Sequence, residues 1–254
     1  MTLIDAAVRA LLQARRAQQT IGAVDVPLPD AAAAYAVQAR VAQALGWFGG
    51  GTPRHWKSGG PSRDAVLTHA PLPPDGVWES PADARARSWS FHFRGIEAEV
   101  ALRLGSDVDA ALAATLDVTT ASALIDAMCV SIELVDSRWI EGLNAPPLAK
   151  LADLQSHGAL VLGEWVPFAT RDWAAQSCVV SIGDAAPRTF RGTHAMGDPA
   201  FVLPGWLRHA TRDGSVLRAG TVVTTGTWCG LPLAVAGDRV VAEFPGIGKA
   251  VVQL

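Results

Sequence analysis

Glu97 and Glu99 are the residues of this sequence whose types and spacing first suggest chemistry. They lie within residues 96–104, where apolar and charged side chains alternate with the period of two that is typical of a half-buried strand. This spacing puts both carboxylates on one face of the strand. Because two like charges repel, the pair needs either a bound cation or a fully hydrated surface. From this stretch alone the hydrated surface is the more common case.

Two further places carry charge in unusual surroundings. Asp136 and Arg138 follow the apolar run 129–135, and charges at the end of a buried strand are costly unless they are paired or coordinated. A structural ion pair and a ligand site are equally good explanations. Lys57 stands beside Trp56 and ahead of Gly59-Gly60. A loop lysine is ordinarily just solvated, although glycines do permit a ligand to approach the backbone closely.

The elements that must position these residues begin with helices. Residues 3–18 have apolar side chains at helical spacing behind Thr2, a suitable N-cap, and Asp30 can cap a second helix over residues 31–45. A loop-rich connection is expected over residues 46–81, a short helix over 120–128, and a polar loop over 148–158. Asp198-Pro199 predicts the start of a helix that continues to about Ala210.

The second half of the chain is dense in predicted strands, at residues 159–162, 179–182, 221–225, 239–244 and 250–254. Strands at this density without regular intervening helices argue against a Rossmann fold or an α/β barrel and favour a curled, antiparallel or mixed β core. We expect an α+β protein with a helical and loop region at 1–75 and a β-rich domain at 76–254, forming one compact unit.

Composition excludes several functions. The chain has 254 residues, is 50% hydrophobic and carries a formal charge of −3, with no basic cluster of the kind that binds nucleic acid. Its beginning lacks the pattern of a signal peptide, and no apolar run approaches the roughly 20 residues of a membrane-spanning helix. The cysteines, Cys129, Cys178 and Cys229, are odd in number and widely spaced, which favours a reducing compartment. We therefore expect a cytoplasmic protein.

Several segments, taken in order, resemble the fumarylacetoacetate hydrolase superfamily, and most closely its branch of 2-oxopent-4-enoate hydratases and 4-oxalocrotonate decarboxylases. Each segment is short, but the ordered set is specific, and it extends from about residue 50 to the end of the chain. The matching segments are Gly95–Leu102, Ile132–Arg138, Leu151–Asp153, Ser156–Gly158, Gly197–Ala200, Leu217–Gly220, Thr224–Thr227, Ala236–Asp238 and Phe244–Gly248. A pair of N-terminal helices is also typical of this branch.

The resemblance implies a fold and a metal site. The expected fold is a curled mixed β roll with N-terminal helices packed on it. The family's metal ligands map onto Glu97, Glu99 and Asp136, which favours metal binding over a hydrated surface. Three carboxylates with open positions suit Mg²⁺ or Mn²⁺, whereas Zn²⁺ prefers nitrogen and sulfur ligands.

The resemblance also implies acid–base and substrate-binding residues. Lys57 matches a lysine of the hydratase branch, so Lys57 and Glu133 are expected to move protons, or Lys57 to pair with the substrate carboxylate. Burial near a metal would lower the pKa of this lysine. Ser156, His157 and Thr227 are the expected substrate contacts. His157 departs from the family pattern, so an ordinary structural histidine is an equally good interpretation.

The implied activity is a divalent-metal-dependent hydratase that adds water to a 2-hydroxy-2,4-dienoate and gives a 4-hydroxy-2-oxo acid in aromatic meta-cleavage catabolism. The first alternative is a 2-oxo-3-enedioate decarboxylase, which needs a cation for the distal carboxylate of the substrate; Arg54, Arg63 and Arg138 are candidates. A C–C bond hydrolase would need a water-activating histidine, for which His55 and His69 are available. A catalytically silent partner of a pathway enzyme is the remaining alternative, and a homo-oligomer is expected in each case.

Overall fold

The computed structural model describes residues 2–23, 26–87 and 90–254. Two helices open the chain, α1 (Leu3–Ala17) and α2 (Ala31–Ala44). Thr2 and Asp5 form a capping box at α1, and the Asp30 side chain accepts a hydrogen bond from the Ala33 backbone at the start of α2. Both predicted helices and both predicted caps are therefore confirmed.

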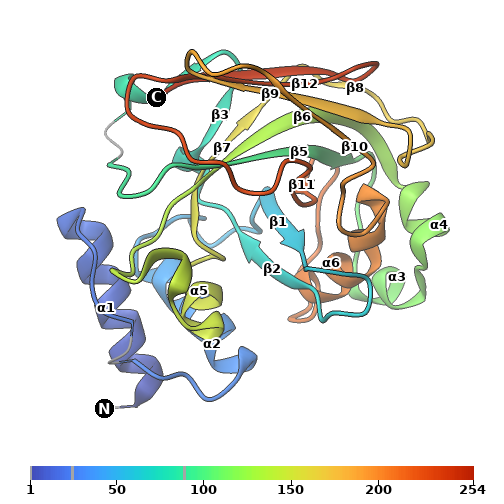
Figure 1. The fold of residues 1–254 in the computed structure, drawn as a ribbon. Coiled ribbons are helices and arrows are strands. Elements are labelled where there is room, and N and C mark those ends of the chain that lie inside the picture. Colours follow the sequence, from blue (N-terminus) through green and yellow to red (C-terminus); the bar gives the residue numbers. More distant parts are fainter. Residues whose placement is uncertain (1, 24–25, 88–89) are drawn as a thin grey trace.

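The main sheet has eight strands in the order β2-β1-β11-β5-β6-β7-β3, with β8 paired to β6 (Figure 1). Antiparallel pairs dominate, but β1 runs parallel to β11, and β3 parallel to β7. The strands are β1 (His55–Gly59), β2 (Thr68–Pro71), β3 (Val77–Glu79), β5 (Gly95–Leu104), β6 (Ile125–Val135), β7 (His157–Leu162), β8 (Val166–Pro167) and β11 (Val222–Thr224). This curled mixed sheet confirms the predicted fold class.

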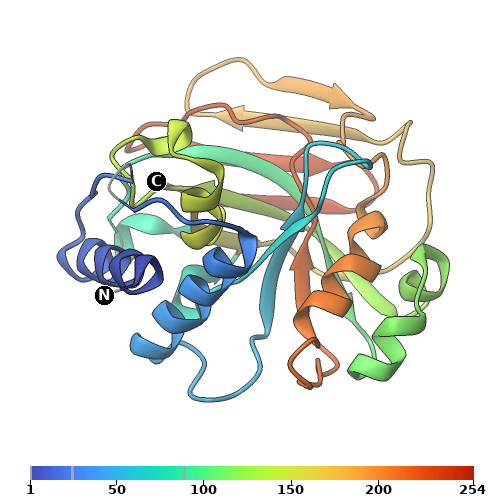
Figure 2. The ribbon, with the colours of Figure 1, turned by 90° about the horizontal axis from the view of Figure 1, so that it is seen from below.

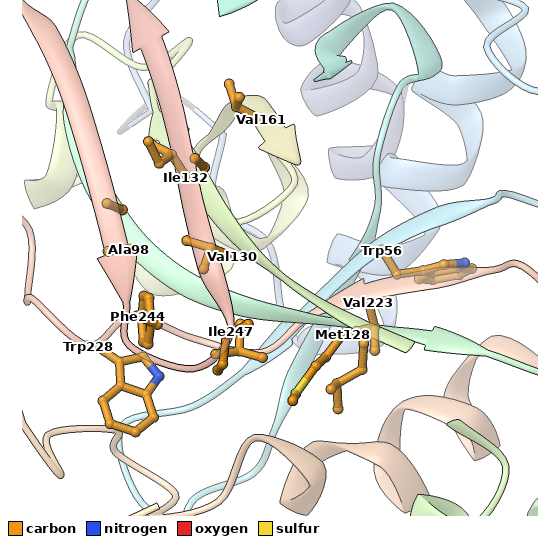
Figure 3. Packing of buried hydrophobic residues seen from close by; sticks show 14 of the residues in the cluster. Trp56, Ala98, Met128, Val130, Ile132, Val161, Val223, Trp228, Phe244 and Ile247 are labelled. Carbon is orange, nitrogen blue, oxygen red and sulfur yellow. The ribbon is translucent and has the colours of Figure 1, made fainter. Parts of the chain in front are cut away.

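A second sheet of five strands covers one face of the first. Its order is β10-β9-β12-β13-β4, from β4 (Ala82–Asp83), β9 (Ser177–Ile182), β10 (Arg188–Arg191), β12 (Arg239–Phe244) and β13 (Gly248–Gln253). Figure 3 shows Phe244 and Ile247 next to Val130 of the main sheet, and all three are buried in the largest apolar cluster. Burial of apolar side chains from both sheets at this interface stabilises the fold.

The helices gather in two groups at opposite sides of the molecule (Figures 1 and 2). One group contains α1, α2 and α5 (Pro147–Ala152), and the other contains α3 (Ala110–Thr115), α4 (Val118–Ser122) and α6 (Leu203–Ala210). Short 3-10 helices complete the chain at η1 (Pro74–Gly76), η2 (Ala84–Ala86), η3 (Gly142–Asn144) and η4 (Pro199–Val202). Asp198 caps η4, and α6 follows without a break, so the helical stretch predicted from Asp198 to Ala210 is confirmed.

The N-terminal helices have a core of their own, in which Leu11 and Val37 pack with Trp139 and α5. A buried ionic network joins this core to the strands. Asp153 accepts hydrogen bonds from Arg15 of α1 (2.8 Å) and from the Arg138 side chain (2.8 Å) after β6. Because Asp153 is fully buried, losing either arginine would leave a carboxylate less well neutralised in the interior.

Three segments differ from the sequence-based expectation. The expected loop at 46–81 contains β1 and β2, which pair within the main sheet although they lie before residue 75. The expected helix at 120–128 is instead the short helix α4, capped by Asp117, followed by β6 from Ile125. The expected loop at 148–158 contains α5 and the start of β7. The division at residue 75 remains a prediction.

Among the described residues, no helix combines the length and apolarity needed to span a bilayer.

Candidate functional site

Glu97, Glu99 and Glu133 converge on one point of the main sheet. Glu97 of β5 lies directly opposite Glu133 of the antiparallel strand β6, and Glu99 lies opposite Ser131. Directly opposed residues of two strands share a face, so the three carboxylates point the same way. One carboxylate oxygen from each lies within 4.8 Å of the others. Carboxylate groups at this spacing match the oxygen-ligand set that Mg²⁺ and Mn²⁺ prefer.

Glu133 is fully buried, and its two oxygens have different surroundings. Oε1 accepts hydrogen bonds from Lys57 Nζ (2.5 Å) and from His157 Nδ1 (3.1 Å). Oε2 is buried without a hydrogen-bond partner among the described residues. Since a buried carboxylate oxygen without a partner is costly, Oε2 is the atom of this group that a bound cation would stabilise most.

Glu99 is held from the neighbouring strand. Its Oε2 accepts hydrogen bonds from the Thr224 hydroxyl of β11 and from the Gly226 backbone N–H (2.9 Å). The Thr224 hydroxyl also lies 3.0 Å from the Ser131 hydroxyl. Glu99 is therefore fixed in orientation by groups that the pairing of β11 with β5 brings to it.

Burial and mutual repulsion shift the pKa values of the three carboxyl groups. Burial raises the pKa of Glu97 well above its usual value, and the charge of Glu133 adds to this effect. Burial and the charge of Glu133 likewise raise the pKa of Glu99. Glu133 behaves differently: burial raises its pKa, but Lys57 and His157 outweigh burial and the net pKa is lowered. Glu97 is half-buried, whereas Glu99 and Glu133 are buried, and when all three are ionised they carry more negative charge than one lysine balances. A divalent cation would balance this charge.

Lys57 lies on β1 and not in a loop, and its ammonium group reaches this cluster. Burial lowers the pKa of Lys57, but the charges of Glu133 and Glu97 more than compensate, and the net pKa is raised. The expected lowering of the Lys57 pKa applies to a lysine beside a bound metal, and it stays a prediction. Lys57 also donates a hydrogen bond to the Gln155 carbonyl oxygen (3.3 Å).

Asp136, the expected third metal ligand, lies outside this group. Its Oδ1 accepts hydrogen bonds from the His92 (3.0 Å) and Phe93 (2.7 Å) backbone N–H groups, and its Oδ2 lies 3.5 Å from Arg138. The reason is the alternation of side chains along β6. Glu133 and Val135 share a face, so Asp136 turns to the other side, towards a cavity beside α1. The same alternation could have identified Glu133 from the sequence.

A left-handed turn forms the other side of the site. Leu154, Gln155 and Ser156 have φ angles of 54°, 55° and 58°, a conformation that costs non-glycine residues energy and is concentrated at functional sites. The Gln155 side chain donates to the Thr68 hydroxyl (2.5 Å), and the Ser156 hydroxyl is buried without a partner among the described residues. Sequence reasoning placed Ser156 in the site but gave no sign of this turn.

A cavity of about 400 Å³ opens over the carboxylates. Of the expected residues, Lys57, Glu97, Glu99, Ser156 and Thr227 line it. Glu133 and His157 lie behind this surface, with the His157 ring against Glu133 and 1% exposed. The lining also includes residues that the sequence did not single out, among them Lys150, Gln155, His194, Met196 and Thr224. His194 is held by a hydrogen bond from its Nε2 to the Thr225 carbonyl oxygen (2.8 Å).

The other candidates from the sequence lie elsewhere. Arg54 donates to the Ala219 carbonyl oxygen, and Arg138 is committed to Asp153. Arg63 donates to the backbone of Met196, at the edge of the cavity. Neither His55 nor His69 is among the described residues that line the cavity, so no histidine at those positions faces the carboxylates.

Comparisons with known proteins agree with this picture. Residues 55–254 match the family model described as fumarylacetoacetate (FAA) hydrolase C-terminal. The chain is 32% identical over 156 residues to "2-keto-4-pentenoate hydratase 1" of Dechloromonas aromatica, covering 61% of this chain and 57% of that protein. It is 31% identical over 156 residues to "2-keto-4-pentenoate hydratase" of Burkholderia vietnamiensis, covering 61% and 58%. The matched part thus spans less than two thirds of these relatives.

Solved structures share the fold. The 4-oxalocrotonate decarboxylase from Pseudomonas putida G7, complexed with magnesium and adipate, superposes with a TM-score of 0.82 at 19% identity, covering 98% of this chain and 96% of that one. The fumarylpyruvate hydrolase from Pseudomonas aeruginosa, in complex with Mn²⁺ and pyruvate, gives a TM-score of 0.55 at 14% identity, covering 80% and 89%. With the family model matching most of the sequence, the chain belongs to the fumarylacetoacetate hydrolase family.

Proposed function

We propose that this protein is a divalent-metal-dependent hydratase that adds water to a 2-hydroxy-2,4-dienoate and forms a 4-hydroxy-2-oxo acid. The observation that carries the proposal is the convergence of Glu97, Glu99 and Glu133 beside Lys57 in one cavity. The similarity to 2-keto-4-pentenoate hydratases supports the substrate class.

The residues present fit a divalent cation. Glu133 Oε2 has no hydrogen-bond partner among the described residues, and three carboxyl groups converge beside it. Both observations favour Mg²⁺ or Mn²⁺ held by Glu97, Glu99 and Glu133. When bound, such an ion supplies a Lewis acid that stabilises negative charge developing on the oxygen at C2 of the substrate. Glu133 is thereby assigned as a metal ligand. It takes the place of Asp136 as the third ligand, and this assignment replaces the acid–base role expected for Glu133.

The protein's own groups would bind and protonate the substrate. The ammonium group of Lys57 can pair with the substrate carboxylate or donate a proton to a vinyl carbon. Its contact with Glu133 and with the Gln155 backbone holds the ammonium group in place. The hydroxyl groups of Ser156 and Thr227, which line the cavity, are suited to hydrogen bonds with substrate oxygens or with the attacking water.

Decarboxylation of a 2-oxo-3-enedioate is the second candidate. It would use the same carboxylates and the same negative charge at C2, and it needs a cation for the second carboxylate of the substrate. The observation in its favour is that Lys150 lines the cavity. A homo-oligomeric assembly, a cytoplasmic location and association with a pathway enzyme remain predictions.

The direct test is a spectrophotometric assay of 2-hydroxypenta-2,4-dienoate with Mg²⁺ or Mn²⁺, using the wild type and Glu99→Gln. We expect metal-dependent loss of the dienoate with formation of 4-hydroxy-2-oxopentanoate, and a loss of at least roughly a hundredfold in kcat/KM for the variant, because the amide removes a charge from the ligand group. A wild type that binds metal but converts neither this compound nor an enedioate would refute both enzyme assignments. Full activity of Glu99→Gln would refute the metal assignment.

A further inference from the structure

The proposed hydration needs a proton acceptor, and no residue has yet been assigned to this task. When water adds across a carbon–carbon double bond, a basic group has to take a proton from the attacking water. Glu97, Glu99 and Glu133 are assigned to the metal ion, and Lys57 is assigned as a proton donor or counter-ion. The acceptor is therefore to be sought among the other groups that line the cavity.

His194 is the imidazole of this cavity. It lies in the segment between β10 and η4, lines the cavity together with Thr225 and Gly226, and is 5% exposed. Of the titratable residues in the described lining, His194 alone is neither a lysine nor a proposed metal ligand. Its ring is thus a base that the proposed reaction has not used.

One hydrogen bond fixes which nitrogen of His194 carries the proton. The ring Nε2 lies 2.8 Å from the Thr225 carbonyl oxygen. Because a carbonyl oxygen can only accept, Nε2 carries the hydrogen, and in the neutral ring Nδ1 keeps its lone pair. Burial lowers the pKa of His194 and, with the charge of Arg63, outweighs the Thr225 contact and the charge of Asp198, so the net pKa is lowered and the neutral ring is favoured.

The lone pair on Nδ1 has no partner within the described chain. His194 Nδ1 is buried and accepts no hydrogen bond from any described residue. The Trp228 ring packs beside the imidazole, with the ring centroids 5.6 Å apart, but its Nε1 is also without a partner among the described residues. Since a buried acceptor without a partner is costly, Nδ1 is suited to a hydrogen bond from a molecule that enters the cavity.

A single peptide unit connects His194 to the proposed metal site. The Thr225 carbonyl oxygen accepts from His194, and the Gly226 N–H of the same peptide unit donates to Glu99 Oε2 (2.9 Å). A planar trans peptide directs its oxygen and its N–H to opposite sides. The imidazole and the Glu99 carboxylate are therefore held on either side of one rigid unit, which fixes the base relative to the end of the site that would bind the C2 oxygen.

We propose that His194 is the general base of the hydration, and that its Nδ1 accepts a proton from the water that attacks C4 of the substrate in its 2-oxo-3-enoate form. This inference rests on the proposed function. As the C4–O bond forms, one O–H bond of water breaks and the proton moves to Nδ1, while the electron pair of the C3–C4 double bond shifts towards the C2 oxygen. Lys57 then protonates C3. His194 and Lys57 afterwards exchange their protons with solvent, so the sum is the addition of one water molecule.

The experiment separates the attack of water from the earlier proton transfer. With 2-hydroxypenta-2,4-dienoate and Mg²⁺ in D₂O, NMR follows deuterium incorporation at C5, which reports ketonisation, and formation of 4-hydroxy-2-oxopentanoate, which reports hydration. His194→Gln keeps a donor for the Thr225 carbonyl oxygen and removes the basic lone pair. We expect it to lower the hydration rate roughly a hundredfold and to accumulate 2-oxopent-3-enoate, with ketonisation and KM within about threefold of the wild type. His92→Gln, at an exposed position outside the cavity lining, is the matched control and should leave both rates unchanged.

The outcomes distinguish this inference from the proposed function. If the wild type hydrates the dienoate and folded His194→Gln loses neither rate, or loses both equally, the role as base is refuted and the proposed function stands. If the wild type forms no 4-hydroxy-2-oxo acid, the proposed function is refuted and the role of His194 with it. Urea unfolding and Mn²⁺ titration of the same samples identify a variant that fails to fold. His194→Asn, whose amide oxygen can accept a hydrogen bond but is not basic, then takes its place and should show the same selective loss of hydration.

Discussion

At the scale of single residues, the difference between Glu133 and Asp136 decides what the site can hold. Both are buried acids at the end of the same strand. Glu133 faces Glu97 and has one oxygen without a partner in the part of the chain that the structure describes, whereas Asp136 accepts hydrogen bonds from two backbone N–H groups. Asp136 also lies outside the group of converging carboxylates and faces Arg138, so the two acids have separate tasks.

We predict that Glu133→Gln weakens Mn²⁺ binding by at least roughly tenfold, because the amide removes a ligand charge while keeping the side-chain shape. Asp136→Asn should bind Mn²⁺ within about threefold of the wild type, on the general expectation that groups away from the ligand set act weakly. Isothermal titration calorimetry with Mn²⁺ measures both variants. The opposite ranking would return Asp136 to the metal site.

At the scale of elements, the pairing of β6 with β7 holds the glutamate in place. Gly158 stands where the register shifts between Leu134 and Val135. A Cβ atom at Gly158 would lie 2.5 Å from the Leu134 carbonyl oxygen and 2.9 Å from the Asp136 Cβ atom. Since the first contact is with backbone, a side chain there could be accommodated only by moving the strand that carries Glu133.

We therefore predict that Gly158→Ala lowers the free energy of unfolding by about 1–3 kcal/mol, the usual cost of forcing a methyl group into a packed site. Equilibrium urea unfolding measures this change. Gly59→Ala is the matched control, since a Cβ atom there meets no atom within 4 Å, and its free energy of unfolding should stay close to that of the wild type. Equal free energies of unfolding for the two variants would contradict a destabilising steric contact at Gly158.

At the scale of the whole molecule, the buried His69 and the half-buried His209 join α2 to the sheet. The rings of His69 on β2 and His209 on α6 lie 4.6 Å apart, and the His209 ring lies 4.4 Å from Tyr35 on α2. Burial, with the nearby charges of His209 and Arg212, lowers the pKa of His69 from 6.5 to about 3. His69 is 5% exposed and bonded through Nδ1 to the Ser58 hydroxyl (2.9 Å), so it is neutral in the folded protein.

This lowered pKa predicts acid sensitivity. Between pH 6.5 and about 3 the unfolded chain binds a proton at His69 that the folded protein does not, so this contribution to stability is complete above pH 6.5 and is lost as the pH falls. We expect the free energy of unfolding to fall from pH 7 to pH 5 by about 2 kcal/mol more in the wild type than in His69→Gln. Urea unfolding at both pH values measures the difference, and His92→Gln, at an exposed position, is the control. Parallel pH dependence of the wild type and His69→Gln would contradict the prediction.

Local sequence determined the features that depend on neighbouring residues. The N-caps of α1 and α2, the strand that carries Glu97 and Glu99, and the curled β core follow from capping chemistry and from the period of two. The caps and the strand are each set by interactions within a few residues along the chain, whereas the β core was indicated by the density of predicted strands. The ordered motifs also indicated the family that residues 55–254 match.

Only the tertiary structure decided which groups meet. A period of two assigns side chains to faces of one strand, but it does not say which strand lies opposite or in which register, because these depend on pairing between distant segments. That pairing puts Glu133 across from Glu97 and places β1, with Lys57, beside β11. It also leaves Asp136 on the other side of β6. The left-handed turn at Leu154–Ser156 is tertiary in the same sense, since the Gln155 side chain is bonded to Thr68 on β2.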